Sequence, residues 1–150
     1  MRITDNRNSR NDKEFVPDDA GEYTEPLLDI IQRMSTGYWP TIGVGKGWYP
    51  LIIDVNKQLT FLCSGYRIIH IGKDNGALQF HFRLPKYDDD TLLEKCIAVV
   101  AKAQTLSRKM CQVCGEQGTA DPSSSGRFVL CEEHIKKVVR KRRIKKDEDQ

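Results

Sequence analysis

Residues 66–84 read YRIIHIGKDNGALQFHFRL, a pattern typical of a β-hairpin. The second half alternates apolar and polar side chains with a period of two, and the first half is rich in β-branched and aromatic residues. Both halves therefore favour strands. The Asp74-Asn75-Gly76 segment between them is a strong turn signal, because Asn and Gly accept the positive φ angles of a tight hairpin turn.

With Asn75 and Gly76 as the loop, the pattern also predicts the register of the hairpin. The expected core-face pairs are Ile71 with Phe80 and Ile69 with Phe82. The expected pair on the opposite, polar face is His70 with His81. A half-buried sheet requires this separation of apolar and polar pairs.

Amphipathic helices are expected on both sides of the hairpin, at residues 25–34, 50–62 and 91–109. Thr24 is the expected N-cap of the first helix, and Pro50 fits the first turn of the second. A short strand at 127–130 and a basic helix at 132–144 follow. Residues 1–23 are too polar to repay their ordering entropy and are expected to form a flexible arm.

The composition is that of one ordinary domain. The 150 residues are 39% hydrophobic and 30% charged, and the net charge of +3 is too close to balance to indicate nucleic-acid binding. No run approaches the roughly 20 apolar residues that span a bilayer, and the polar start lacks the apolar stretch of a signal peptide. We therefore expect no membrane partner and, with an odd number of cysteines, a reducing cytoplasm.

Four metal-ligating residues occur in two pairs near the C-terminus. Cys111 and Cys114 belong to a C-x-x-C-G knuckle, and Cys131 and His134 follow at the same i, i+3 spacing where a helix is expected to begin. Three thiolates and an imidazole complete a tetrahedral zinc site with no open position for catalysis. The sequence therefore predicts one structural zinc ion per chain.

Two other interpretations of these four residues stay open, namely buried thiols beside a chance histidine and an iron–sulfur cluster. The two remaining cysteines, Cys63 and Cys96, lie on helical stripes and are expected to pack in the core.

The predicted fold class is α+β, with the β-hairpin packed under two or three helices and a C-terminal treble-clef-like zinc module. The expected organisation is a flexible arm at 1–23, a helix, hairpin and long-helix core at 24–110, a zinc module with a basic helix at 111–146, and an acidic tail at 147–150.

Three segments together resemble a family of small uncharacterised phage and bacterial proteins. They are Gly47-Trp48-Tyr49-Pro50, the Lys73–Phe80 part of the hairpin, and the C-x-x-C-G and C-x-x-H pairs, which together span about two thirds of the chain. The family typically has a second turn glycine and an arginine where this chain has Ala77 and Gln79. The resemblance implies a phage or bacterial origin, hence a bacterial host cytoplasm, and supplies no catalytic residue.

Two weaker patterns have simple structural interpretations. The Gly43-x-Gly45-x-Gly47 segment matches neither phosphate-binding glycine motif, so it is expected to form a bend that lets Trp48 pack. The His70 and His81 pair, with Gln79 and Arg83 on the same strand face, is either an ordinary polar face or a second metal or acid–base site without an obvious third ligand.

The sequence contains no recognisable catalytic motif, so we expect a non-enzymatic binding module. The leading hypothesis is a phage or mobile-element accessory protein that docks on a host or phage macromolecule, for example as an inhibitor of a host system. A protein partner would use the aromatic residues Tyr38, Trp39, Trp48 and Tyr49.

The alternative is DNA or RNA binding through the phosphate-binding residues Lys136, Lys137, Arg140, Lys141, Arg142, Arg143, Lys145 and Lys146.

Overall fold

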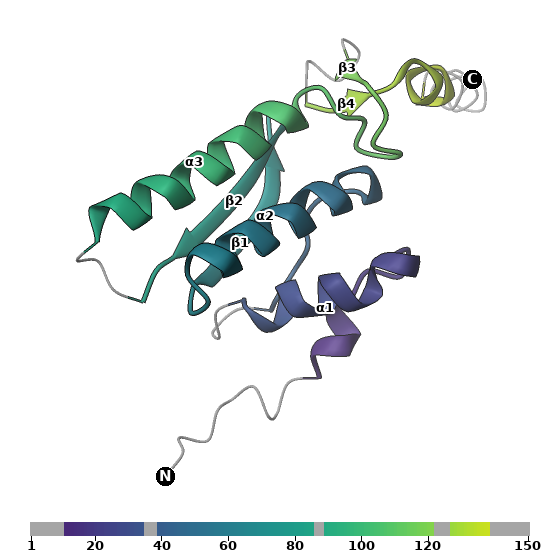
Figure 1. The fold of residues 1–150 in the computed structure, drawn as a ribbon. Helices are drawn as coiled ribbons and strands as arrows, with labels where there is room; N and C mark the ends of the chain where they lie inside the picture. The colour runs from purple at the N-terminus through teal and green to yellow at the C-terminus, as the bar shows by residue number, and fades with distance from the viewer. Residues whose placement is uncertain (1–10, 35–38, 86–88, 122–126, 139–150) are drawn as a thin grey trace.

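The computed structural model describes residues 11–34, 39–85, 89–121 and 127–138 (Figure 1). The α+β prediction is confirmed. The helices are α1 (Thr24–Gln32), α2 (Tyr49–Leu62), α3 (Asp90–Ser107) and residues 132–138. The strands are β1 (Arg67–Asp74), β2 (Ala77–Arg83), β3 (Thr119–Ala120) and β4 (Val129–Leu130). Short 3-10 turns are η2 (Asp12–Phe15), η3 (Gly21–Tyr23) and η4 (Lys46–Trp48).

The main core lies between the helices and the β1–β2 hairpin. Helix α2 packs against both α1 and α3, and α3 packs against β2 (Figure 1). The apolar stripe of α2 is buried, with Ile52 and Leu59 fully inaccessible to solvent. At the start of α3, the carboxylate of Asp89 accepts a hydrogen bond from the backbone N–H of Leu92 at 3.0 Å, which caps the helix.

A buried polar chain links α1, α2 and the residue that precedes β1. The hydroxyl of Tyr66 donates to the side-chain oxygen of Asn56, and the amide of Asn56 donates to the carboxylate of Asp29 at 2.7 Å. The guanidinium of Arg33 lies 4.9 Å from the centre of the Tyr66 ring. Because the buried hydroxyl of Tyr66 and the buried amide of Asn56 both have hydrogen-bond partners, these contacts fix the relative positions of the three elements at a low desolvation cost.

The hairpin turn is the predicted one. Asn75 and Gly76 have positive φ angles of 51° and 78°, as a two-residue hairpin loop requires. Near the turn, the strands also pair in the predicted register, with Ile71 opposite Phe80 on the core face.

Farther from the turn, the predicted pair of Ile69 with Phe82 is wrong. A β-bulge between Ile68 and His70 shifts the register, and Ile68 takes the place opposite Phe82. Ile68 is fully buried, whereas Ile69 is 54% exposed. The cause lies on the other side of β1, where the backbone N–H of Ile68 donates to the carbonyl of Arg33 at 2.9 Å. This contact with the end of α1 competes with an unbroken hairpin ladder.

The prediction of a flexible arm at 1–23 is wrong for residues 11–23, while residues 1–10 lie outside the described part of the chain. Ala20 is buried, and Asp19 accepts a hydrogen bond from the hydroxyl of Tyr49 at 2.7 Å. The ring of Tyr23 meets that of Tyr49 edge to face. Thr24 is the first residue of α1 rather than its cap, and its hydroxyl donates to the carbonyl of Gly21.

Helix α3 buries a narrower stripe than its sequence suggests. Cys96 and Ala103 are buried, but Ile97 and Leu106 are largely exposed. Cys63, at the end of α2, is half-buried, and both cysteines are free thiols. Each helix in the described ranges is too short or too polar to cross a bilayer.

The bulge makes a testable distinction between two adjacent isoleucines. Ile68→Ala should lower the free energy of unfolding by about 2–5 kcal/mol, because it removes fully buried atoms and leaves a cavity. Ile69→Ala should cost less than about 1 kcal/mol. Urea unfolding of both variants checks this, and equal losses would contradict the shifted register.

Candidate metal centre

The four predicted ligands come from two local structures that follow α3. Cys111 and Cys114 belong to a tight knuckle in which the backbone N–H of Gly115 donates to the carbonyl of Cys111 at 2.9 Å. Gly115 has a φ of 82°, a conformation that favours glycine. Cys131 directly follows β4, and His134 lies in the helix at 132–138. The small β3–β4 sheet connects the two halves of the centre.

The ligand atoms of Cys111, Cys114, Cys131 and His134 lie within 4.8 Å of one another. The Sγ atoms of Cys114 and Cys131 are 3.7 Å apart, and Nδ1 of His134 lies 3.0 Å from Sγ of Cys131 and 3.5 Å from Sγ of Cys111. A tetrahedral ion with bonds of about 2.3 Å to sulfur places two sulfurs about 3.8 Å apart. The arrangement is therefore compatible with a metal site.

Within the described ranges, this is the one group of three or more Cys, His, Asp or Glu side chains close enough to share an ion. Cys111 is buried, Cys131 and His134 are half-buried, and Cys114 is exposed. The centre thus lies at the surface with one side sealed by the protein. All four predicted ligands are brought together.

The surroundings change the acidity of two of the thiols. Burial raises the pKa of Cys111, but hydrogen bonds from the backbone N–H groups of Cys131, Cys114 and Val113 outweigh it and lower that pKa to about 7. For Cys114, the backbone N–H of Glu116 lowers the pKa, yet burial and the neighbouring thiols raise it overall to about 11. A bound cation favours the thiolate form of every sulfur, so metal binding here would release protons.

The knuckle packs directly on the glycine-rich segment before α2. The backbone N–H of Gly47 donates to the carbonyl of Gln112 at 2.9 Å. A Cβ atom at Gly47 would overlap the carbonyl oxygen of Cys111 and lie 2.6 Å from the backbone nitrogen of Gly115. A Cβ at Gly45 would overlap the carbonyl oxygen of Gln112. These glycines therefore allow two backbones to touch, an interaction that the sequence alone does not reveal.

The same contact explains the position of Trp48. Its ring is fully buried, and its Nε1 donates to the carbonyl of Met110 at 2.8 Å, just before the first ligand. The predicted bend that lets Trp48 pack is confirmed. Of the four aromatic residues considered for partner binding, Trp48 and Tyr49 are buried in the core and are not accessible to a partner.

Trp39, in contrast, is 78% exposed, and its ring lies 5.4 Å from that of Phe15. Tyr38 lies outside the described residues. The most exposed large apolar side chain in the described ranges is Phe61, at 90%. Sequence reasoning missed it, although Phe61 falls off the apolar stripe of α2 and its position was therefore a usable signal.

Only the first two predicted phosphate-binding cations are described. The ammonium of Lys136 lies 3.4 Å from the carboxylate of Glu132, and that of Lys137 lies 3.9 Å from Glu133. Each of these lysines therefore lies one helical turn after a glutamate that neutralises part of its charge. Outside the described residues lie Arg140, Lys141, Arg142, Arg143, Lys145, Lys146 and the predicted acidic tail at 147–150.

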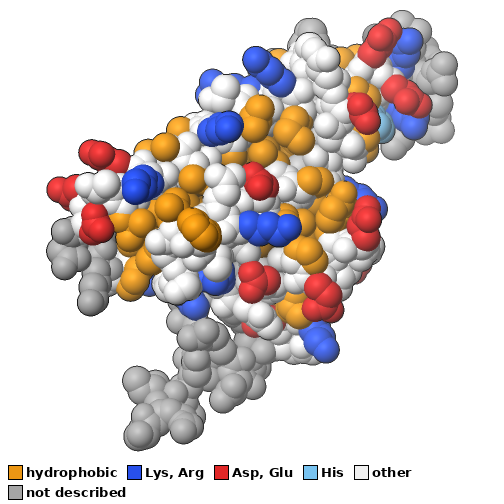
Figure 2. Space-filling model, in the orientation of Figure 1, with side chains coloured by type: hydrophobic (Ala, Val, Ile, Leu, Met, Phe, Trp, Pro, Cys, Tyr) orange, Lys and Arg blue, Asp and Glu red, His pale blue; other side chains and the backbone are white. Residues whose placement is uncertain are grey.

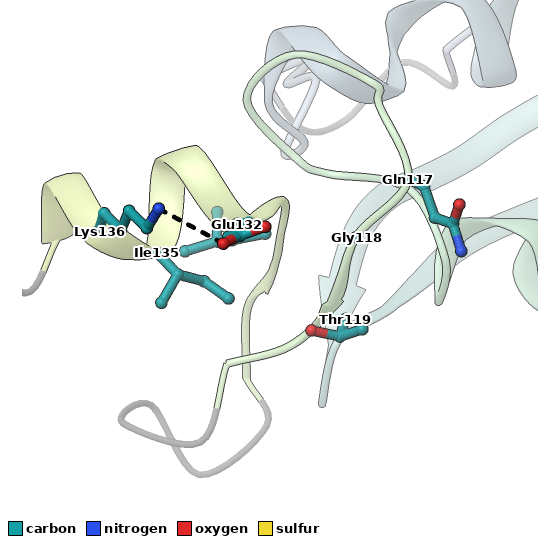
Figure 3. Close-up of a pocket in the computed structure, with 7 residues that line it drawn as sticks. Gln117, Gly118, Thr119, Glu132, Ile135 and Lys136 are labelled. Carbon is teal, nitrogen blue, oxygen red and sulfur yellow. Dashed lines mark ion pairs between the residues drawn. The ribbon is translucent and has the colours of Figure 1, made fainter.

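A shallow pocket of about 480 Å³ lies beside the metal centre (Figure 3). Its walls come from the segment at 117–119, from Leu130 and from the helix that carries His134. The ion pair between Glu132 and Lys136 crosses one wall. Because its acid is paired with a neighbouring cation and Thr119 has no general base beside it among the lining residues, we assign no chemistry to this pocket.

No family model, curated protein or solved structure matches the chain. The interpretation of the centre therefore rests on its donor atoms and on the packing around them. The four donor atoms converge, and the knuckle that carries two of them is fixed to the core. Both observations support a metal site.

The backbone contact at Gly47 can be tested with a matched glycine. Gly47→Ala should lower the free energy of unfolding by about 2–3 kcal/mol, because the new Cβ forces the knuckle away from the core. Gly65→Ala is the control, since a Cβ there meets only Pro85 at an ordinary 3.5 Å, and its effect should stay within about 1 kcal/mol. Similar losses in thermal unfolding of both variants would contradict this role of Gly47.

Proposed function

We propose that this chain is a non-enzymatic binding protein whose C-terminal module is held together by one structural zinc ion. The observation that carries the proposal is the convergence of Cys111, Cys114, Cys131 and His134. Three thiolates and one imidazole suit zinc and fill its tetrahedral coordination, so no position is left for a reacting water or substrate. The metal would therefore stabilise the module rather than catalyse a reaction.

The order of the surrounding elements supports a treble-clef type of module. A knuckle with two ligands is followed by the β3–β4 pair and then by a helix that carries the fourth ligand. The short strands and single helix bury little apolar surface by themselves. Binding of zinc, at about 10–16 kcal/mol for structural sites, would supply much of the energy that orders this region.

An apolar groove between α2 and α3 is the surface that we propose for docking. Figure 2 shows hydrophobic side chains gathered where these two helices lie side by side. The exposed ring of Phe61 dominates the groove. The remaining lining residues are Lys57, Gln58, Leu62, Lys95, Ala98 and Val99. A large aromatic ring beside a groove is typical of the anchors that contribute most to protein interfaces.

The charges of the groove indicate the chemistry of its partner. Lys57 on α2 and Lys95 on α3 line it from opposite sides, and its described lining holds no carboxylate. An amphipathic helix with acidic residues beside its apolar face would complement both features. We therefore propose that a segment of this kind, from a partner protein, occupies the groove.

The resemblance to small phage and bacterial proteins supports a role as an accessory protein that acts on a host or phage macromolecule. Nucleic acid is the less favoured partner, because Lys136 and Lys137 lie beside Glu132 and Glu133 on the same helix. Peptide selection and salt-dependent binding of duplex DNA distinguish these two classes of partner.

Elemental analysis tests the metal. Protein purified without chelators should contain one zinc per chain, and Cys114→Ser should lose it. Because Cys114 is exposed, this substitution removes little packing, so a fall in melting temperature of about 10 °C or more would reflect lost coordination. Cys63→Ser should retain the zinc. Iron with visible absorbance, or no metal at all, would contradict the zinc assignment.

The groove can be tested with short random peptides displayed on phage and selected on the zinc-loaded chain. Selected peptides should combine acidic and apolar residues, and their binding should shift backbone amide resonances of α2 and α3. Phe61→Ser should weaken their affinity about thirtyfold or more, because it removes the aromatic anchor.

Trp39→Ser is the matched control, since it removes another exposed ring without touching the groove. If peptide affinity depends on Trp39 and not on Phe61, docking in the α2–α3 groove is contradicted. A selection that yields no binding peptide contradicts it as well. Steeply salt-dependent binding of random duplex DNA that is lost on deletion of residues 136–150 would instead support the nucleic-acid function.

A further inference from the structure

A second set of metal-ligating atoms lies on the exposed face of the β1–β2 hairpin. The predicted pairing of His70 with His81 is confirmed, and their ring centres are 5.7 Å apart. Both side chains are exposed to solvent. The two histidines lie on the turn side of the bulge, in the register that the turn sets, and the bulge instead redirects the side chain of Ile69 to the exposed face.

Two further residues complete the arrangement. The ring of His70 lies over Gly72, where a Cβ atom would be only 2.7 Å from the histidine Nε2. Gly72 pairs across the ladder with Gln79, and the side-chain oxygen of Gln79 lies 3.2 Å from Nε2 of His81. Nε2 of His70 thus lies over Gly72, and Nε2 of His81 lies beside the side-chain oxygen of Gln79, the residue that pairs with Gly72. The missing side chain at Gly72 provides the space.

This geometry suits one shared ion. With a bond of about 2.1 Å from metal to imidazole nitrogen, two rings that bind the same ion have centres about 5–6 Å apart. The observed separation of 5.7 Å falls in this range without any movement of the strands. Imidazole nitrogens together with an oxygen donor favour borderline divalent ions of the late transition series.

We propose that His70, His81 and Gln79 form a second, open metal site that takes a borderline divalent cation such as Zn²⁺. Three protein donors leave at least one coordination position for water, unlike the closed centre at Cys111. The site has no thiolate, and Arg83 lies two residues beyond His81 with its own positive charge. Binding should therefore be much weaker and exchange faster than at the Cys/His centre. This inference does not depend on the proposed docking function.

Titration with Zn²⁺ tests the proposal directly. The protein is first loaded with one zinc per chain, dialysed, and then titrated with ZnCl₂ in a calorimeter near pH 7.5. One further equivalent should bind. The chain has three histidines, and the third is His134 of the closed centre, so imidazole resonances that shift in the second step should be those of His70 and His81.

Substitutions identify the ligands. His70→Asn and His81→Asn should each weaken the second step about tenfold or more, and Gln79→Ala about threefold. Gln32→Ala, at an exposed position of α1, is the matched control and should leave both zinc-binding steps unchanged. All variants should keep the first zinc and the melting temperature, because these side chains are exposed or half-exposed and outside the core.

Absence of a second equivalent in the wild-type titration would overturn the proposal. It would also be overturned by a second step that survives in the His70→Asn/His81→Asn double variant, because the ion would then bind elsewhere in the chain.

Discussion

The contact of Gly47 with the knuckle is the constraint on which the rest of the structure depends. Two backbones meet there without intervening side chains, and the N–H of Gly47 donates to the carbonyl of Gln112. The contact joins the start of α2 to the first pair of metal ligands. It also explains why Trp48, whose Nε1 donates to Met110, belongs to the core and not to a binding surface. The metal centre is therefore an extension of the main core.

The two halves of the chain are stabilised by different physical effects. Most of the continuous apolar core comes from described residues between α1 and the end of α3, and Ile52, Ile68 and Trp48 are fully inaccessible in it. The region after α3 has two-residue strands and a short described helix, so its apolar burial is limited. A metal bound by Cys111, Cys114, Cys131 and His134 would supply the missing stabilisation, since such binding contributes directly to folding. Because the Gly47 contact joins the two regions, loss of the metal should also destabilise the apolar core, and loss of core packing should weaken metal binding.

The two faces of the β1–β2 hairpin differ in polarity and therefore have different roles. Its apolar face is covered by the helices, whereas its opposite face carries His70 and His81. The bulge at Ile69 accommodates a contact from the end of α1, whereas the regular part of the ladder near the turn holds the two histidines opposite each other. The α2–α3 groove lies on the helical layer. The molecule thus has a candidate metal centre, a proposed docking groove and a proposed open metal site on different parts of its surface.

Local patterns in the sequence determined the α+β class, the turn at Asn75 and Gly76, and the four converging ligands, because each depends on residues close together in the chain. The tertiary structure decided what depends on distant partners. It placed the bulge at Ile69 through a contact with Arg33, and it packed the knuckle against the backbone of Gly47. It also left Ile97 and Leu106 exposed, although both belong to the apolar stripe of α3. These features arise from competition between distant segments for the same backbone and surface, which no local pattern records.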